Sequence, residues 1–276
     1  MELSPGIWGL LPLVLVALIF ALNQLYRRWR RYRQLTRPFP QSWVDSLNDT
    51  LAIYPRLETG ERNRLHQMIH VFLDEKTFYG CAGFEVTEEV QVTIAAQACL
   101  LCLGKNVPLY PKLQSILVYP DAFIASRDVY GDNGVVADAQ HHLLGESWDN
   151  GRIILSWADT VAGANNFSDG KNVVLHEFAH QLDSGSGVTN GVPPLWRNSY
   201  QSWATVFSDN FEDLRSRVQR KLPTIIDDYG ATNEAEFFAV ATETFFERPG
   251  ELAQRRPDLF DELLQYYQID PRRWHR

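Results

Sequence analysis

The sequence predicts an α+β domain that follows one N-terminal transmembrane helix. An uncharged, mostly apolar segment extends from Ile7 to Leu25. In the body, strand-like segments are followed by helical segments without regular strand–helix alternation, which favours the α+β class. Apolar residues make up 45% of the 276 residues and charged residues 22%, so the body can form a sizeable core. We therefore divide the chain into an anchor over residues 1–35 and one domain over residues 36–276.

The N-terminal segment has the length and flanks of a membrane span. Its 19 residues, 7–25, are close to the length that crosses a bilayer as a helix. Trp8 at one end, and Tyr26 and Trp29 at the other, fit aromatic anchors at the interfaces. A cleaved signal peptide would need a positive leader, whereas the leader here holds only Glu2. A buried core helix is the other alternative, and the charged flank disfavours it.

A basic collar follows this segment and separates it from an acidic body. Five arginines lie within seven residues: Arg27, Arg28, Arg30, Arg31 and Arg33. The positive-inside rule then predicts that the body faces the cytoplasm. Without residues 1–35 the chain carries 21 basic and 33 acidic residues, a net charge of −12. This charge argues against direct nucleic-acid binding, and three cysteines are too few for a disulfide framework.

Hydrophobic spacing predicts the order of elements in the body. After a short linker, helices are expected within residues 41–73 and over residues 87–103, 172–182, 196–214 and 235–247. Strands are expected over residues 113–119, 143–148 and 153–157. The last two flank Asp149-Asn150-Gly151, which is typical of a hairpin turn. Glycine-containing segments at 74–85 and 184–194 are predicted as loops.

The pattern HEFAH at residues 176–180 predicts a catalytic metal site. Residues four apart share one face of a helix, so His176 and His180 can bind a single cation. Glu177 is offset by one position, so it can reach a water on that cation and act as general base. Two imidazoles, a carboxylate and one open position suit zinc, and we expect one Zn²⁺ per chain.

A third ligand must come from elsewhere in the chain. Glu236 is our first choice, and Glu243, seven residues later on the same helical face, stays open as the alternative. Glu236 also follows Asn233 at the spacing of a capping box, so it could merely close a helix end. Tyr229 lies just before this helix. It is either an ordinary buried tyrosine or a phenol that stabilises the oxyanion of a tetrahedral intermediate.

Two further patterns are interpreted as structural. His66 and His70 are four apart, but no glutamate follows the first of them. Cys99 and Cys102 have the spacing of redox and metal motifs, but their neighbours are apolar and no second pair exists. We therefore expect both pairs to be packing residues.

Several segments together resemble a known family. HEFAHQLD at 176–183, with NVVL before it and NGVPPLW at 190–196 after it, resembles the Mlc titration factor A family of bacterial zinc-dependent peptidases. GESWDNGRIILSW at 145–157 and AEFFAVATETFF at 235–246 also fit that family. YGATNEAEFFA at 229–239 is similar to the corresponding segment of the catalytic domain of anthrax lethal factor, a related zincin. The resemblance extends over residues 40–270.

The resemblance implies a zincin-like fold, in which the helix that carries the HExxH pattern packs on a small sheet. It implies that zinc is bound by His176, His180 and Glu236. It also implies that Glu177 is the base and Tyr229 an active-site phenol. Glu236 is thereby favoured over Glu243, and Asp183 could support a ligand histidine.

The function implied is hydrolysis of peptide bonds, with a leaning toward aminopeptidase activity. The substrate backbone could pair with an edge strand such as residues 153–156. The family's namesake activity is binding of a glucose-responsive transcriptional repressor. The alternative is therefore a membrane-tethered regulator that sequesters a repressor, with peptidase activity secondary. The family's best-known members look soluble, whereas this chain is expected in the bacterial inner membrane as a single-pass protein.

Overall fold

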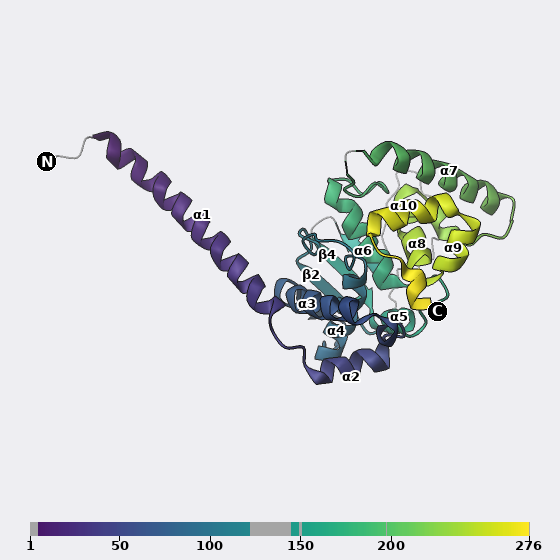
Figure 1. Ribbon diagram of the computed structural model, residues 1–276, viewed down its shortest axis with the longest axis horizontal. Helices are drawn as coiled ribbons and strands as arrows, with labels where there is room; N and C mark the ends of the chain where they lie inside the picture. Colours follow the sequence, from purple (N-terminus) through teal and green to yellow (C-terminus); the bar gives the residue numbers. More distant parts are fainter. Residues whose placement is uncertain (1–4, 122–144, 149–150, 197, 276) are drawn as a thin grey trace, which may run out of the picture.

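The computed structural model describes residues 5–121, 145–148, 151–196 and 198–275 (Figure 1). Its helices are α1 (Pro5–Leu35), α2 (Gln41–Thr50), α3 (Thr59–Glu75), α4 (Glu88–Leu100), α5 (Trp157–Asn165), α6 (Val173–Asp183), α7 (Tyr200–Gln219), α8 (Glu234–Glu247), α9 (Pro249–Arg255) and α10 (Pro257–Tyr267). Short 3₁₀ turns include η1 (Tyr54–Arg56), η3 (Asp228–Ala231) and η4 (Pro271–His275). The helices predicted from apolar spacing are all present, with shifted ends.

A four-stranded mixed sheet lies in the first half of the body. Its order is β1 (Thr77–Gly80), β2 (Ser115–Tyr119), β4 (Arg152–Ser156) and β3 (Gly145–Trp148). The first three strands are parallel, and β3 pairs antiparallel with β4, as expected for the two strands of a hairpin. Asp149 and Asn150 of the predicted turn lie outside the described residues. Helix-rich structure around a small sheet fits the α+β class.

Two details of the sheet correct the sequence interpretation. Residues 77–80, predicted as loop, form a strand, so β1, α4 and β2 make a parallel crossover. This strand has four residues, mostly exposed, and therefore lacks an alternating apolar pattern. Residues 153–156 are not an edge, because β4 lies between β2 and β3 with Ile153 and Leu155 fully buried. The edge beside it is β3.

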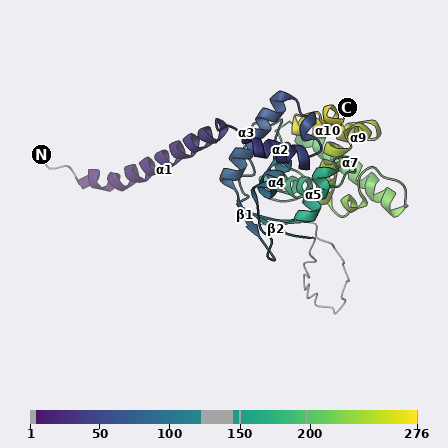
Figure 2. The same cartoon turned by 90° about the horizontal axis from the view of Figure 1, so that it is seen from below.

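The body has two parts that meet at α6. Figures 1 and 2 show α2 to α5 around the sheet and α7 to α10 gathered on the other side. Helix α6 contacts β3 and β4 on one side and α8 on the other. The helical part encloses an aromatic core that includes Trp203, Phe238 and Tyr267. The helix that carries the HExxH pattern, α6, is thus held by the sheet on one face and by α8 on another.

Helix α1 extends away from the body (Figure 1). Its C-terminal end is attached to α3 through Asp74, which pairs with Arg30 Nε at 2.8 Å and accepts from Gln34 Nε2 at 2.8 Å. Within the described residues, no helix has the length and apolar character that crossing a membrane requires. The predicted anchor is therefore not supported, and the cytoplasmic orientation stays a prediction.

The His66/His70 pair and the Cys99/Cys102 pair lie among packed side chains. His66 accepts a hydrogen bond from Tyr54 Oη at 2.7 Å and stacks on Phe39 at 3.8 Å. Cys99 and Cys102 are fully buried free thiols. Among the described residues, neither pair belongs to a group that could hold a metal.

Candidate metal centre

The helix that carries the HExxH pattern begins at a well-defined cap. Asn172 is buried, and its Oδ1 accepts from the backbone N–H of Leu175 at 3.0 Å. Its side-chain amide donates to Gln97 Oε1 on α4 at 3.0 Å. Asparagine is a preferred N-cap residue, so this contact fixes where α6 starts. The histidine pattern begins one turn later.

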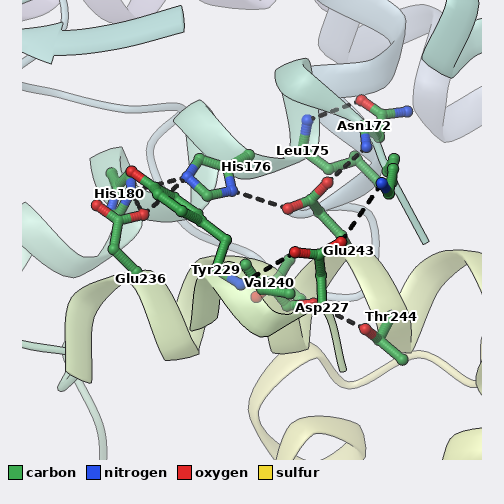
Figure 3. A network of polar contacts seen from close by, with 12 residues as sticks. Asn172, Leu175, His176, His180, Asp227, Tyr229, Glu236, Val240, Glu243 and Thr244 are labelled. Atoms are coloured by element: carbon green, nitrogen blue, oxygen red, sulfur yellow. Dashed lines mark hydrogen bonds and ion pairs between the residues drawn. The ribbon is translucent and has the colours of Figure 1, made fainter. Parts of the chain in front are cut away.

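His176, His180 and Glu236 come together at one point (Figure 3). The Nε2 atoms of the two histidines are 3.2 Å apart. Glu236 Oε2 lies 3.0 Å from Nε2 of His176 and 3.3 Å from Nε2 of His180. The three side chains come from α6 and α8, and Glu236 follows His180 by 56 residues along the chain. These three residues could hold a metal ion.

The spacing of these atoms fits tetrahedral zinc. Zinc binds histidine nitrogen and carboxylate oxygen at about 2.0–2.2 Å, which places neighbouring ligands of a tetrahedron roughly 3.3 Å apart. The three observed separations, 3.0, 3.2 and 3.3 Å, are close to that edge length. Two imidazoles and one carboxylate form one face of the tetrahedron and leave a fourth position open, as in catalytic zinc sites.

The two interpretations of Glu236 turn out to involve different parts of the residue. Asn233 Oδ1 accepts from the backbone N–H of Glu236 at 3.0 Å and caps α8. The carboxylate of Glu236 is not used in that cap and lies against the histidines. The cap therefore positions the carboxylate.

Glu243 lies on the opposite side of the His176 ring. Its Oε1 accepts from His176 Nδ1 at 2.8 Å, and its Oε2 accepts from the backbone N–H of Asn172 at 2.5 Å. With its proton on Nδ1, the neutral ring can offer the Nε2 lone pair to a metal ion. Glu243 thus binds the ring of His176 and is not part of the group that could hold a metal ion.

The charges of the site act strongly on each other. Burial alone would raise the pKa of Glu236, but hydrogen bonds from His176 and His180 outweigh it and hold that pKa well below its usual range. Burial lowers the pKa of His176, but Glu236 and Glu243 raise it well above its ordinary value. The site therefore favours positive charge between these side chains, as a cation would supply.

Glu177 and Tyr229 flank the ligand group. Glu177 is buried on α6, and its charge raises the pKa of both His176 and Tyr229. The ring of Tyr229 lies 6.0 Å from the ring of His176 (Figure 3). Burial, followed by the charges of Glu236 and Glu177, raises the pKa of Tyr229 to about 12. The phenol therefore keeps its proton at neutral pH and can donate a hydrogen bond.

Asp183 has a different role from the one considered. Its Oδ2 accepts from the backbone N–H of Gly191 at 2.7 Å, and Gly191 O accepts from Trp203 Nε1 at 3.0 Å. Among the described hydrogen bonds, those of Asp183 go to this loop and not to a ligand histidine. Asp183 thereby holds Gly191 in the position where it contacts Trp203 of α7.

The sequence interpretation missed three residues that shape the site: Asn172, the histidine-binding role of Glu243, and Glu247 one turn further along α8. Asn172 precedes His176 by four residues, and an asparagine before an apolar run is a cap signal. Nothing in the local pattern could show that these two glutamates bind backbone N–H groups of residues 170–172 and, for Glu243, the ring of His176.

Comparison with known proteins places the chain in a family. An uncharacterized protein from Synechocystis sp. is 45% identical over 245 residues, which are 88% of this chain and 89% of the relative. Mlc titration factor A of Escherichia fergusonii is 31% identical over 233 residues, 83% and 86% of the two chains. Mlc titration factor A of Yersinia pestis is 31% identical over 240 residues, 84% and 87%. A family model described as glucose-regulated metallo-peptidase M90 matches residues 26–268, and the chain belongs to this family.

Proposed function

We propose that this chain is a zinc-dependent metallopeptidase that hydrolyses peptide bonds. The observation that supports this most is the convergence of His176, His180 and Glu236 at tetrahedral spacing. Glu177 and Tyr229 lie beside that group with the chemistry that amide hydrolysis needs. Membership in a metallopeptidase family supports the same reaction.

Each side chain has a distinct task in this proposal. Bound zinc would supply Lewis acidity, polarising a carbonyl oxygen and making a water more acidic. Glu177 takes the proton of the attacking water and delivers it to the leaving amine. Tyr229 donates a hydrogen bond to the carbonyl oxygen as negative charge develops there. His176, His180 and Glu236 hold the metal.

The substrate is proposed to bind as an extended strand along β3. This strand is the edge of the sheet next to α6, and it contacts that helix. An edge strand presents unpaired backbone groups that a peptide can pair with. The scissile bond would then lie over the HExxH helix.

The test uses the full chain with zinc and two sets of peptides, one with free and one with acetylated N-termini. Peptidase activity predicts cleavage that a chelator abolishes and added zinc restores. Cleavage of free N-termini alone would establish the aminopeptidase activity that the family resemblance favours. Cleavage of both sets would establish an endopeptidase, and cleavage of neither would contradict the proposal.

A second candidate is binding of a transcriptional repressor. It is supported by the name of two relatives, Mlc titration factor A, and by the net charge of −12 on the body, which suits a basic partner. Glu177→Gln separates the two functions, because a pure binder would keep its affinity for a purified Mlc-type repressor. No binding by the wild type would remove this candidate.

A further inference from the structure

We propose that Glu243 is a positioning residue that orients His176 toward the metal, an inference that rests on the proposed zinc site but not on turnover. Its two carboxylate oxygens have different partners. Oε1 accepts from His176 Nδ1 at 2.8 Å, and Oε2 accepts from the backbone N–H of Asn172 at 2.5 Å. One side chain thus holds both the imidazole and the first turn of its helix (Figure 3).

The chemistry of this position requires two acceptors. Glu243 is 7% exposed, so little water can replace a lost partner. A glutamine has one carbonyl oxygen and one NH₂ group. Whichever way it turned, the NH₂ would face either the N–H of Asn172 or the N–H of His176. One donor would lose its acceptor, and the ring would be free to rotate or to change tautomer.

A neighbouring glutamate completes the attachment between the two helices. Glu247 Oε2 accepts from the backbone N–H groups of Gly170 at 2.8 Å and Lys171 at 3.0 Å. Three consecutive amides, 170–172, are therefore bound by carboxylates of α8. Because α8 also carries Glu236, this attachment sets the position of His176 relative to the third ligand.

Glu247→Gln is a matched control for Glu243→Gln. Both amides bonded to Glu247 go to the same oxygen, so a glutamine carbonyl can accept both. Burial, followed by the charge of Glu243, raises the pKa of Glu247 to about 9, so it is protonated at neutral pH and resembles glutamine in shape and charge. Both substitutions replace one carboxylate oxygen by an NH₂ group, at positions one helical turn apart on α8. Only Glu243→Gln removes an oxygen that accepts a hydrogen bond from a donor with no other acceptor among the described residues.

The experiment measures the zinc dissociation constant of the full chain by competition with a chromophoric chelator, and the visible spectrum of the Co²⁺ form. Glu243→Gln is expected to weaken zinc binding about 10–100-fold and to change the Co²⁺ spectrum. Glu243→Asp, which keeps two acceptor oxygens, should recover part of the affinity. The zinc dissociation constant of Glu247→Gln should stay within about threefold of wild type, because this variant keeps Glu243 as the hydrogen-bond partner of His176.

The inference is overturned if Glu243→Gln binds zinc within threefold of wild type with an unchanged Co²⁺ spectrum. It is also overturned if Glu247→Gln weakens zinc binding as much as Glu243→Gln does. The loss of affinity would then reflect the attachment of residues 170–172 to α8 and not the orientation of the His176 ring. If Glu243→Gln does not fold, Glu243→Asp against Glu247→Gln decides by the same two readouts. A wild type that binds zinc but cleaves no peptide would end the proposed function and leave this result standing.

Discussion

Individual side chains of the site combine a local and a distant role. The backbone N–H of Glu236 satisfies the cap of α8, while its carboxylate faces two histidines of another helix. The HExxH spacing could be predicted because it lies within one helical turn of sequence. The bond between Glu243 and His176 joins residues 67 positions apart, so local spacing could only suggest a choice between two glutamates.

At this scale Tyr229→Phe tests the oxyanion role. The phenol is protonated at neutral pH and lies beside His176, so the change removes one hydrogen-bond donor and little else. We expect kcat to fall by about 10²-fold, as for loss of one oxyanion donor, with KM and zinc content unchanged. A kcat within twofold of wild type would show that Tyr229 is an ordinary aromatic neighbour.

Elements were predictable where their apolar spacing is long and regular. Helices α4, α6 and α8 have buried faces of several turns, and all three were expected. β1 was missed because a four-residue strand with exposed side chains has no pattern of its own and forms by pairing with β2. Pairing between segments 38 residues apart is a property of the fold and not of the local sequence.

The loop over residues 184–196 depends on one close approach to α8. Gly191 has φ +78°, and a Cβ there would lie 2.4 Å from the carbonyl oxygen of Glu234. Gly191→Ala should lower the free energy of unfolding by about 1–3 kcal/mol and weaken zinc binding, because α8 must shift. Gly187→Ala is the matched control, since Gly187 also has positive φ, +107°, but nothing within 4 Å. Equal effects in denaturant unfolding would contradict the role of this contact.

The contact between η1 and α3 predicts a pH dependence of stability. Burial, followed by the charge of Arg62, lowers the pKa of His66 to about 4, and Tyr54 binds the neutral ring. The unfolded chain takes up this proton near pH 6.5, so the stabilisation is complete above that pH and is lost as pH falls toward 4.

His66→Gln removes this titration and keeps an acceptor for Tyr54. Between pH 7 and 4.5, wild type should lose about 1 kcal/mol more unfolding free energy than the variant, a figure reduced for the partial exposure of the ring. Urea unfolding of both proteins in chelator measures the difference without any contribution from metal release. Parallel pH profiles would contradict the account.

In the whole molecule, the candidate metal site lies where the sheet-containing part meets the helical part. Helix α6 contacts β3 and β4 as well as α8, and the side chains that could hold a metal ion come from α6 and α8. A metal that binds only the folded chain adds RT ln(1 + [Zn]/Kd), about 4 kcal/mol at a thousandfold excess over Kd. We therefore expect a chelator to lower the thermal midpoint of wild type. The chelator should lower the thermal midpoint of Glu236→Gln much less. An identical fall in wild type and in the variant would show that zinc binds at some other site.

The measurement that tests the central claim most directly is zinc content together with peptide hydrolysis in wild type and Glu177→Gln. Glu177 lies next to the ligand histidines without being part of the ligand group, so the substitution should leave one zinc per chain. Turnover should fall by about 10²–10⁴-fold, the usual contribution of a general base. One zinc in both proteins with cleavage only by wild type is the predicted result. Equal cleavage by the variant, or no zinc in either protein, would contradict the account.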